Sequence, residues 1–212
     1  MALFLLAILA LPLITGPELD GARRWIPLGP LTLNSGLLVA PLLSVLAMRD
    51  KSGGWLFLAA GAAIAALQVD AALALAFTLA ALAWSYHCKD LKGLLPVLLG
   101  VAVFIHALRS GGPPPVAFVE GLVPILWERS SWLAAGLVAL LLTTPIFLLR
   151  KRELSQRDGS VLALVFIAFC AISFLANYPT PLAGYGASSI LGFMLAMAAA
   201  RRQTTDKQRP ET

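Results

Sequence analysis

The chain has 212 residues, of which 59% are hydrophobic and only 13% are charged, and its formal net charge is +5. Soluble globular domains carry about 25% charged residues, so the composition excludes an ordinary soluble domain and indicates an integral membrane protein. The basic residues flank apolar segments, which argues against a nucleic-acid partner and for a role in membrane topology.

Eight apolar segments follow one another along the chain. Their predicted bounds are 2–16, 33–48, 55–68, 70–86, 93–108, 132–149, 160–176 and 185–200. Several are shorter than the ~20 residues that a perpendicular membrane-spanning helix needs, but uncharged flanking residues can lengthen each one. The pattern predicts an all-α, polytopic membrane helix bundle with about eight transmembrane helices. We expect one transmembrane domain over residues 1–200 and a polar, disordered tail over 201–212.

The run 54–86 is interrupted only by Gln68 and Asp70. A single long, tilted helix is one interpretation, but it would place an ionised Asp70 near the middle of the bilayer at a high cost in free energy. Two helices joined by a turn at 68–70 would place this carboxylate at the membrane interface instead. We therefore predict two helices.

Basic residues are distributed unevenly over the loops of the eight-helix topology. Twelve of the 16 Lys and Arg residues lie on the side of the two termini: Arg49, Lys51, Lys89, Lys92, Arg150, Lys151, Arg152, Arg157, Arg201, Arg202, Lys207 and Arg209. By the positive-inside rule, both termini are predicted to be cytoplasmic. A single helix over 54–86 would move the later loops to opposite sides and abolish this asymmetry.

Four connections face the other, extracytoplasmic side in this topology: 16–30, 68–70, 109–131 and 177–184. They hold nearly all the unusual residues of the chain. The predicted cytoplasmic loops are short, basic and otherwise featureless. A functional site is therefore expected to open outward.

The segment Asn177–Ser189 reads NYPTPLAGYGASS and carries no charge. Its prolines and glycines predict an irregular backbone. At membrane depth, such a backbone is tolerated only where it is buried in protein or lines a wet cavity. The segment is either the wall of a site or a well-formed interfacial turn.

Two other outer connections carry chemically versatile side chains. Arg23 and Arg24 could hold a phosphate or carboxylate bidentately, whereas arginines next to Trp25 could equally be membrane-interface anchors. In the loop 109–131, the apolar stretch 116–127 is expected to form a short interfacial helix. Glu120 lies within it, and partial desolvation there would raise its pKa and suit it to general-base catalysis.

Three stretches of these outer connections resemble motifs of one family. Asp20–Leu33, DGARRWIPLGPLTL, resembles the NGAxRWIxLGPxxF stretch of the SEDS family, the FtsW, RodA and SpoVE group. Gln68–Asp70 and the apolar run after it are similar to the family's QPDxGTA element. Pro181–Ser189, PLAGYGASS, is similar to PFISYGGSS, with Gly184 for the first serine and Ala187 for the second glycine. The resemblance implies a SEDS-like helix bundle over nearly the whole chain.

The resemblance also implies an activity, because SEDS proteins are peptidoglycan glycosyltransferases that polymerise a lipid-linked disaccharide precursor. Their proposed catalytic aspartate lies in the sequence HTDFIFAVIGEELG. When Glu128 is placed on the first glutamate of GEE, Glu120 falls on that aspartate. Glu120 is thus the candidate catalytic base, and Arg23, Arg24 or Arg109 would neutralise the pyrophosphate leaving group.

Further candidate substrate-binding residues come from the same connections: Trp25, Asp70, Tyr185, Ser188 and Ser189. No cofactor is expected, although a divalent cation could bridge the substrate pyrophosphate. The isolated histidines and cysteines show no metal-ligand spacing.

The chain departs from the family at its QPSExxK segment, whose glutamate and lysine fall at Leu37 and Ala40. The loop that carries Glu120 is also shorter than in the family. These differences leave three hypotheses open. The chain could be a divergent glycosyltransferase, a non-catalytic scaffold or lipid-precursor-binding subunit that kept the fold, or a transporter of the lipid precursor.

The resemblance implies a setting in bacterial cell-wall synthesis, during division or the maintenance of cell shape. The implied substrate is an undecaprenyl-linked glycan precursor. The implied partners are membrane lipids and a single-span transpeptidase or another membrane protein of division or elongation. The implied location is the bacterial cytoplasmic membrane.

Overall fold

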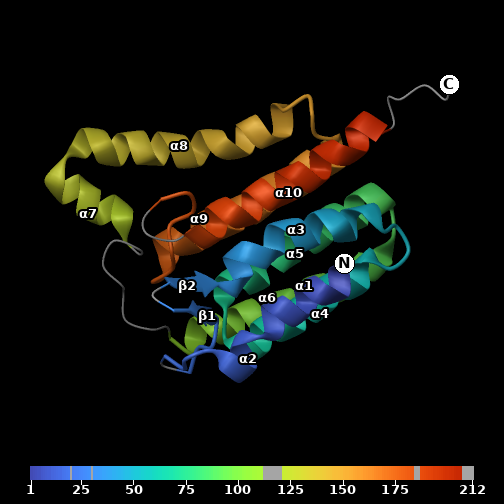
Figure 1. Cartoon of the computed structure of the whole chain (residues 1–212), viewed down its shortest axis with the longest axis horizontal. Coiled ribbons are helices and arrows are strands. Elements are labelled where there is room, and N and C mark those ends of the chain that lie inside the picture. Colours follow the sequence, from blue (N-terminus) through green and yellow to red (C-terminus); the bar gives the residue numbers. More distant parts are fainter. Residues whose placement is uncertain (20, 30, 112–120, 184–186, 207–212) are drawn as a thin grey trace.

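The structure is a computed structural model that describes residues 1–19, 21–29, 31–111, 121–183 and 187–206. It is a mostly helical bundle (Figure 1). Helices occupy all eight predicted apolar segments: α1 (Ala2–Ala10) with α2 (Pro12–Thr15), α3 (Ser35–Arg49), α4 (Gly54–Gln68), α5 (Ala71–Cys88), α6 (Leu94–Arg109) after a 3₁₀ turn (Leu91–Gly93), α8 (Ser131–Arg150), α9 (Gln156–Leu175) and α10 (Ala187–Asp206). The prediction of a helix bundle is confirmed.

The run 54–86 forms two helices, as predicted. Val69 adopts a left-handed conformation (φ 52°, ψ 45°) and ends α4. The Asp70 side chain then accepts a hydrogen bond from the Leu73 N–H at 3.0 Å and begins α5 as its N-cap. Asp70 is fully buried within the bundle, and its position at the membrane interface stays a prediction.

One element of the outer connections was not predicted. β1 (Trp25–Leu28) and β2 (Leu31–Asn34) form an antiparallel hairpin, with Trp25 opposite Asn34. The all-α prediction is wrong for this segment, which the sequence analysis had treated only as an outer connection leading into an apolar helix. Asn34 ends the hairpin and also caps α3, since its side chain accepts from the Leu37 N–H at 2.9 Å.

Four helical segments are long and apolar enough to cross a membrane: Ala71–Cys88, Leu91–Arg109, Ser131–Arg150 and Gln156–Leu175. The remaining apolar helical segments are shorter: Ala2–Thr15, Ser35–Arg49, Gly54–Gln68 and Ala187–Arg201. Within the described residues, the chain is therefore a multi-pass membrane helix bundle. The figure of eight spans stays a prediction.

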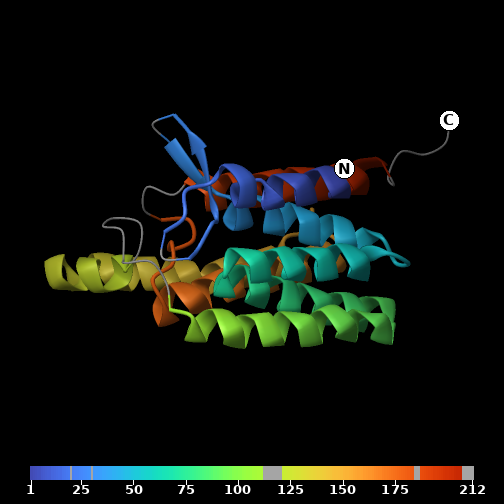
Figure 2. The same cartoon turned by 90° about the horizontal axis from the view of Figure 1, so that it is seen from below.

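The connections are sorted between the two ends of the bundle (Figures 1 and 2). The outer end, as we call it, carries the hairpin, α2, the α4–α5 turn, the loop after α9, and α7 (Leu122–Arg129). The inner end carries the basic loops 50–53, 89–93 and 151–155 and the end of α10. This is the separation predicted from the charges. The orientation of the two ends across a membrane stays a prediction.

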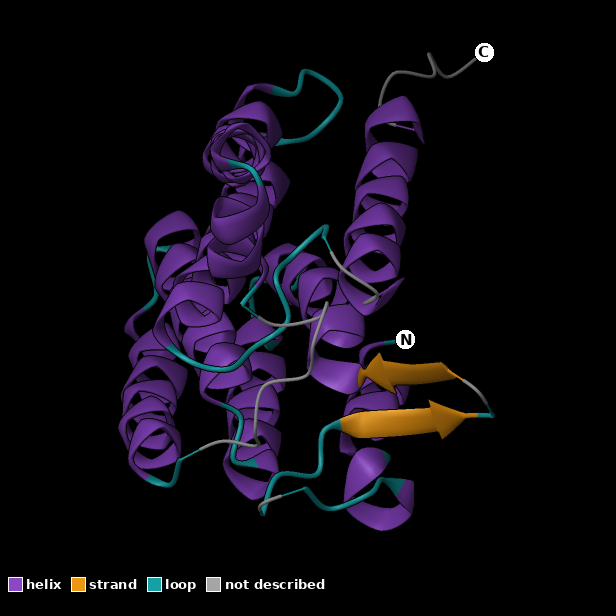
Figure 3. Ribbon diagram, turned by 90° about the vertical axis from the view of Figure 1, so that its left-hand side faces the viewer, coloured by secondary structure: helices purple, strands orange, loops and turns teal. Residues whose placement is uncertain are grey.

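α7 corresponds to the later part of the short helix predicted at 116–127, while residues 116–120 lie outside the described part of the chain. Seen from the outer end, the hairpin stands at the edge of the helix bundle (Figure 3).

α8 packs mainly on α9 and α7. Its outward residues Trp132, Leu142 and Phe147 are exposed, as expected of a helix that faces lipid.

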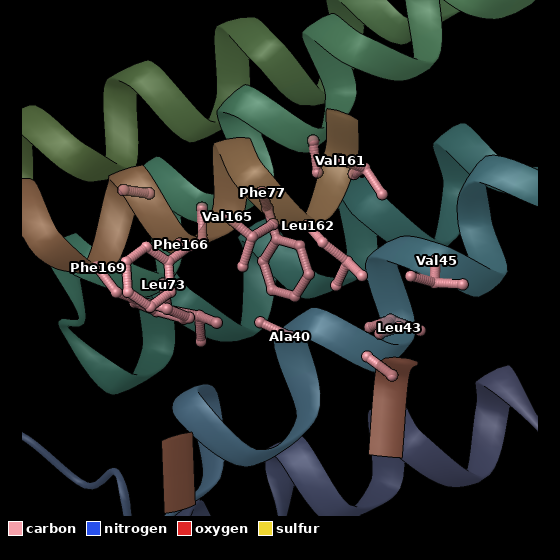
Figure 4. Packing of buried hydrophobic residues seen from close by; sticks show 14 of the residues in the cluster. Ala40, Leu43, Val45, Leu73, Phe77, Val161, Leu162, Val165, Phe166 and Phe169 are labelled. Atoms are coloured by element: carbon pink, nitrogen blue, oxygen red, sulfur yellow. The ribbon is translucent and has the colours of Figure 1, made fainter. Parts of the chain in front are cut away.

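α5 lies at the centre of the core and packs against α3, α4, α6 and α9. Its alanines allow these helices to approach closely. A Cβ on Gly61 of α4 would lie 2.6 Å from the Phe77 ring of α5. Figure 4 shows Phe77 of α5 beside Leu162 of α9 and Ala40 of α3. This tight packing positions the beginning of α5, where Asp70 lies.

Candidate functional site

A cavity of about 350 Å³ lies at the outer end. The ends of α5, α6 and α9 supply an apolar wall of Val69, Ala71, Ala107, Leu108, Ile172 and Leu175. Arg24, Asn177 and Tyr178 supply a polar wall. The cavity thus joins an apolar surface to hydrogen-bonding groups, which suits an amphiphilic ligand.

Arg24 is the cationic group of this cavity, and it is only 4% exposed. Its backbone carbonyl accepts a hydrogen bond from the Ser35 N–H, which ties the residue to the beginning of α3. Its guanidinium carbon lies 4.7 Å from the centre of the Trp25 ring and 5.1 Å from that of Tyr178. Stacking on aromatic rings is favourable for a guanidinium group.

The stacking leaves one edge of the Arg24 guanidinium without a partner. Its Nε and Nη2 atoms are buried and make no hydrogen bond with any part of the chain that the structure describes. Buried charges in proteins are normally paired, because desolvation is costly. Nε and Nη2 together form the side that binds a phosphate or carboxylate bidentately. Arg24 is therefore a ready-made partner for an oxyanion.

Tyr178 contacts the Arg24 guanidinium and belongs to the same polar wall of the cavity. Its ring is buried and is nearly parallel to that of Phe169, at a centroid distance of 6.2 Å. Its hydroxyl donates a long hydrogen bond of 3.4 Å to Asp70 Oδ2. Burial, and after it the Asp70 carboxylate, raises the pKa of the Tyr178 phenol well above its usual value. The phenol therefore stays protonated at neutral pH and acts as a donor.

The neighbouring polar residue Gln68 has a structural role. It is fully buried, and its Nε2 donates to the Leu9 carbonyl oxygen at 2.5 Å. This bond ties the end of α4 to α1. Together with the cap that Asp70 provides, it fixes the α4–α5 turn beside the cavity.

Ser188 and Ser189 support the site from the beginning of α10. The Ser188 hydroxyl accepts from the Asn34 N–H at 2.8 Å, and the Ser189 hydroxyl accepts from the Leu182 N–H at 3.2 Å. These bonds hold the hairpin and the preceding loop against α10.

The remaining predicted residues are spread over the outer end. Arg23 is exposed and pairs with Glu18, its Nε lying 2.9 Å from Glu18 Oε2. Arg109 is exposed at the end of α6, next to Leu108 and Gly111 of the cavity. Trp25 contributes its ring to the Arg24 stack. The candidate base Glu120, and Tyr185, lie outside the described residues.

No group of three or more His, Cys, Asp or Glu side chains in the described ranges is placed to hold a metal ion. The polar wall of the cavity is cationic and hydrogen-bonding. It offers an anion a direct partner in Arg24, without a metal ion between them.

Neither a family model nor a curated protein matches the chain. A solved structure that does match is the crystal structure of a point mutant of the rod shape determining protein RodA from Thermus thermophilus, with a TM-score of 0.64 and 18% sequence identity. The match covers 98% of this chain and 78% of that one. The chain has a RodA-like fold.

At this identity the likeness shows the fold, a polytopic membrane helix bundle. It confirms the sequence resemblance at that level. The stretches that carry the resemblance lie at one end of the RodA-like bundle: the described residues of 20–33 in the hairpin, 68–70 in the α4–α5 turn, and the described residues of 181–189 around the start of α10.

Tyr178 is the site residue that sequence reasoning missed. It lies in the segment Asn177–Ser189, but the candidate residues predicted in that segment were Tyr185, Ser188 and Ser189. Its local signal was an aromatic hydroxyl next to Pro179. Its contacts with Arg24 and Asp70 bridge long stretches of sequence, and only the tertiary structure reveals them.

Proposed function

We propose that this chain is a SEDS-like membrane protein of bacterial cell-wall synthesis that binds an undecaprenyl-linked glycan precursor at its outer end. The observation that carries the proposal is that Arg24, whose Nε and Nη2 atoms are buried and unpartnered, lines a cavity with an apolar wall. A prenyl diphosphate matches both features, because it joins a dianionic head to an apolar chain. The RodA-like fold supports the same conclusion by analogy.

In the proposed reaction, a hydroxyl group of the acceptor sugar attacks the anomeric carbon of a lipid-linked donor. A new glycosidic bond forms while the bond to the diphosphate breaks, and the diphosphate leaves with the electron pair. Glu120 accepts the proton from the hydroxyl group. Arg24 stabilises the charge that develops on the diphosphate. A bidentate contact within a desolvated cavity is the strong form of this interaction.

The test is polymerisation of lipid-linked disaccharide precursor by the purified protein in lipid bilayers, followed by gel analysis of the glycan products. Glu120→Gln and Arg24→Gln are each expected to abolish polymer formation. Arg23→Gln is the matched control, because Arg23 is exposed and already paired with Glu18. Polymerisation that survives Glu120→Gln removes Glu120 from the mechanism.

A specific observation favours a second candidate, a non-catalytic scaffold or precursor-binding subunit. Leu37 and Ala40, which stand where the family has a charged pair, are buried in the apolar core. Losing both charges leaves none unpaired, so the fold tolerates the change, but any chemistry of that pair is lost. Precursor binding without turnover, together with co-purification of a single-span transpeptidase, would select this candidate.

The proposed location is the bacterial cytoplasmic membrane, with the inner end and both termini in the cytoplasm. The support is the concentration of Lys and Arg in the inner-end loops. A reporter enzyme that is active only outside the cytoplasm, fused after Thr212, is expected to be inactive. The same reporter inserted at Gly111 is expected to be active.

A further inference from the structure

The side chain of Tyr178 contacts two buried groups of opposite charge. The guanidinium carbon of Arg24 lies over the ring, 5.1 Å from its centre. The hydroxyl at the tip of the same ring contacts Asp70 Oδ2 at 3.4 Å. Arg24 is 4% exposed and Asp70 is fully buried. The outer end thus holds a buried cation and a buried carboxylate at two different parts of one aromatic side chain.

Arg24 and Asp70 do not pair with each other. The ion pairs among the described residues are Arg23 with Glu18, Arg49 with Asp158, and Arg201 with Glu153. This separation is unexpected, because opposite charges attract strongly where water is excluded. Direct pairing would also satisfy the Nε and Nη2 atoms that now lack a partner.

The Tyr178 ring is held by contacts with its neighbours. Phe169 stacks on it at an interplanar angle of 7°, and its hydroxyl contacts Asp70. The Trp25 ring also stacks with the Arg24 guanidinium. Because the guanidinium contacts the ring and the carboxylate contacts the hydroxyl, one side chain holds the two charged groups at different places.

We infer that Tyr178 is a positioning residue that keeps Arg24 and Asp70 apart, so that the Nε/Nη2 edge of Arg24 stays available to the oxyanion of a diphosphate ligand. This inference rests on the proposed function, which assigns Arg24 to anion binding. Without the spacer, Asp70 competes with the ligand for the same guanidinium edge. The lipid diphosphate and free pyrophosphate share the recognised group, and the apolar wall of the cavity distinguishes them.

The spacer role predicts a specific pattern in a double-mutant cycle. Tyr178→Leu removes the ring and lets Arg24 pair with Asp70, so anion binding is lost. Asp70→Asn removes the competing charge but keeps the cap of α5, because asparagine and aspartate are comparable N-caps. In the double variant, the Nε and Nη2 atoms of Arg24 again have no carboxylate of the protein to pair with. Anion binding is therefore restored by a second substitution, which a merely structural role of Tyr178 does not predict.

The experiment measures dissociation constants of the full chain in zwitterionic nanodiscs by calorimetry, with farnesyl diphosphate and inorganic pyrophosphate as probes. Relative to the unsubstituted chain, Tyr178→Leu is expected to bind about tenfold more weakly or worse, since coupling energies in such networks correspond to about 2- to 150-fold in affinity. Asp70→Asn alone and the double variant are expected to bind with nearly the original affinity. Tyr178→Phe keeps the ring beside Arg24 but loses the hydroxyl contact with Asp70, so its affinity should lie between those of the unsubstituted chain and Tyr178→Leu.

The matched control is Tyr86→Leu, at the far end of α5, where the side chain is 79% exposed. It should leave binding unchanged. If Tyr178→Leu does not give a cooperative thermal transition, Tyr178→Met, which also lacks a ring, replaces it in the cycle. Tighter binding of farnesyl diphosphate than of pyrophosphate identifies a lipid ligand, while equal affinities identify a site for the free anion, and both results support the spacer if the cycle holds.

Two results overturn the inference, and they are distinguishable. If the unsubstituted chain binds both probes but Asp70→Asn does not restore binding to the ring-deleted variant, Tyr178 is not a spacer and the anion site stands. If the unsubstituted chain binds neither probe, the anion site itself fails, and the proposed function loses the observation that carries it.

Discussion

Two arginines at opposite ends of the bundle, Arg49 and the more deeply buried Arg24, have different surroundings. At the inner end, the Nη2 of Arg49 lies 3.2 Å from Asp158 Oδ2 and 3.3 Å from the Ala199 carbonyl oxygen. At the outer end, Arg24 has aromatic rings as neighbours and no carboxylate partner among the described residues. The Nε atom makes no hydrogen bond in either arginine. The two arginines therefore differ in whether a carboxylate neutralises the guanidinium.

This difference separates a structural arginine from a candidate binding arginine. Arg49 joins α3 to α9 and α10 and is neutralised within the protein. Arg24 keeps its positive charge buried beside a cavity. A buried charge without a partner is unfavourable unless a ligand supplies the opposite charge. The comparison thus predicts that the two residues respond oppositely to substitution.

The largest effect is expected from Asp158→Ala, which leaves the partly buried Arg49 without its counter-ion. Breaking a buried ion pair by removing one partner costs about 3–5 kcal/mol. The measurement is the free energy of unfolding in detergent micelles. Glu153→Ala is the control, because it breaks the exposed pair with Arg201 and should cost less than about 1 kcal/mol. Equal losses in the two variants would contradict a structural role for the inner ion pair.

Arg24→Met tests the opposite end. It removes an uncompensated cation and keeps an apolar stem between the Trp25 and Tyr178 rings, so we expect thermal stability to rise. Binding of farnesyl diphosphate should weaken by about 10- to 100-fold, because hydrogen bonds to charged groups contribute about 1.5–3 kcal/mol. Calorimetry in nanodiscs and a thermal melt measure the two quantities. A fall in stability without loss of binding would make Arg24 a structural residue like Arg49.

Asp70 is buried at the same end of the bundle as Arg24, and it also caps α5. Its substitution therefore separates the effect of a buried charge from the effect of a helix cap. Asp70→Ala removes the acceptor for the Leu73 N–H and should lower the unfolding free energy by about 1 kcal/mol. Asp70→Asn should retain most of the stability. The two variants are compared by thermal unfolding. A large loss with asparagine would show that the charge, and not the cap, holds this turn.

The smallest effect is expected at the exposed turn of the inner end. The Gly53 N–H, followed by the Ser52 side chain, lowers the pKa of Asp50 below its ordinary value of 3.8. Because the folded-state pKa is lowered, any stabilisation by this turn is present above the unfolded-state pKa and is lost as the pH falls through the folded-state pKa. A carbon-detected NMR titration should place the Asp50 midpoint below 3.8. A midpoint at or above this value would contradict the hydrogen bonds of the turn.

Much of the fold could be predicted from local features of the sequence. Apolar length located the eight helical segments, and the polar break at 68–70 separated α4 from α5. The distribution of Lys and Arg predicted which connections lie together at each end of the bundle. The hairpin Trp25–Asn34 was missed, because its prolines and glycine resemble those of an irregular loop and its pairing with α10 through Ser188 is a long-range contact.

Local features of the sequence identify this chain as a helical membrane protein with its unusual residues gathered in the outer connections, because apolar length and loop charge act locally. Arg24 and Asp70 were candidates from the sequence too, but as members of separate motifs. The tertiary structure brings both into contact with Tyr178 and leaves two guanidinium nitrogens of Arg24 without a partner beside a cavity. The physical reason is that residues 24, 70 and 178 meet only once α3, α5 and α9 have packed together. Burial and pairing, which decide whether an arginine is structural or available to a ligand, are properties of that packing.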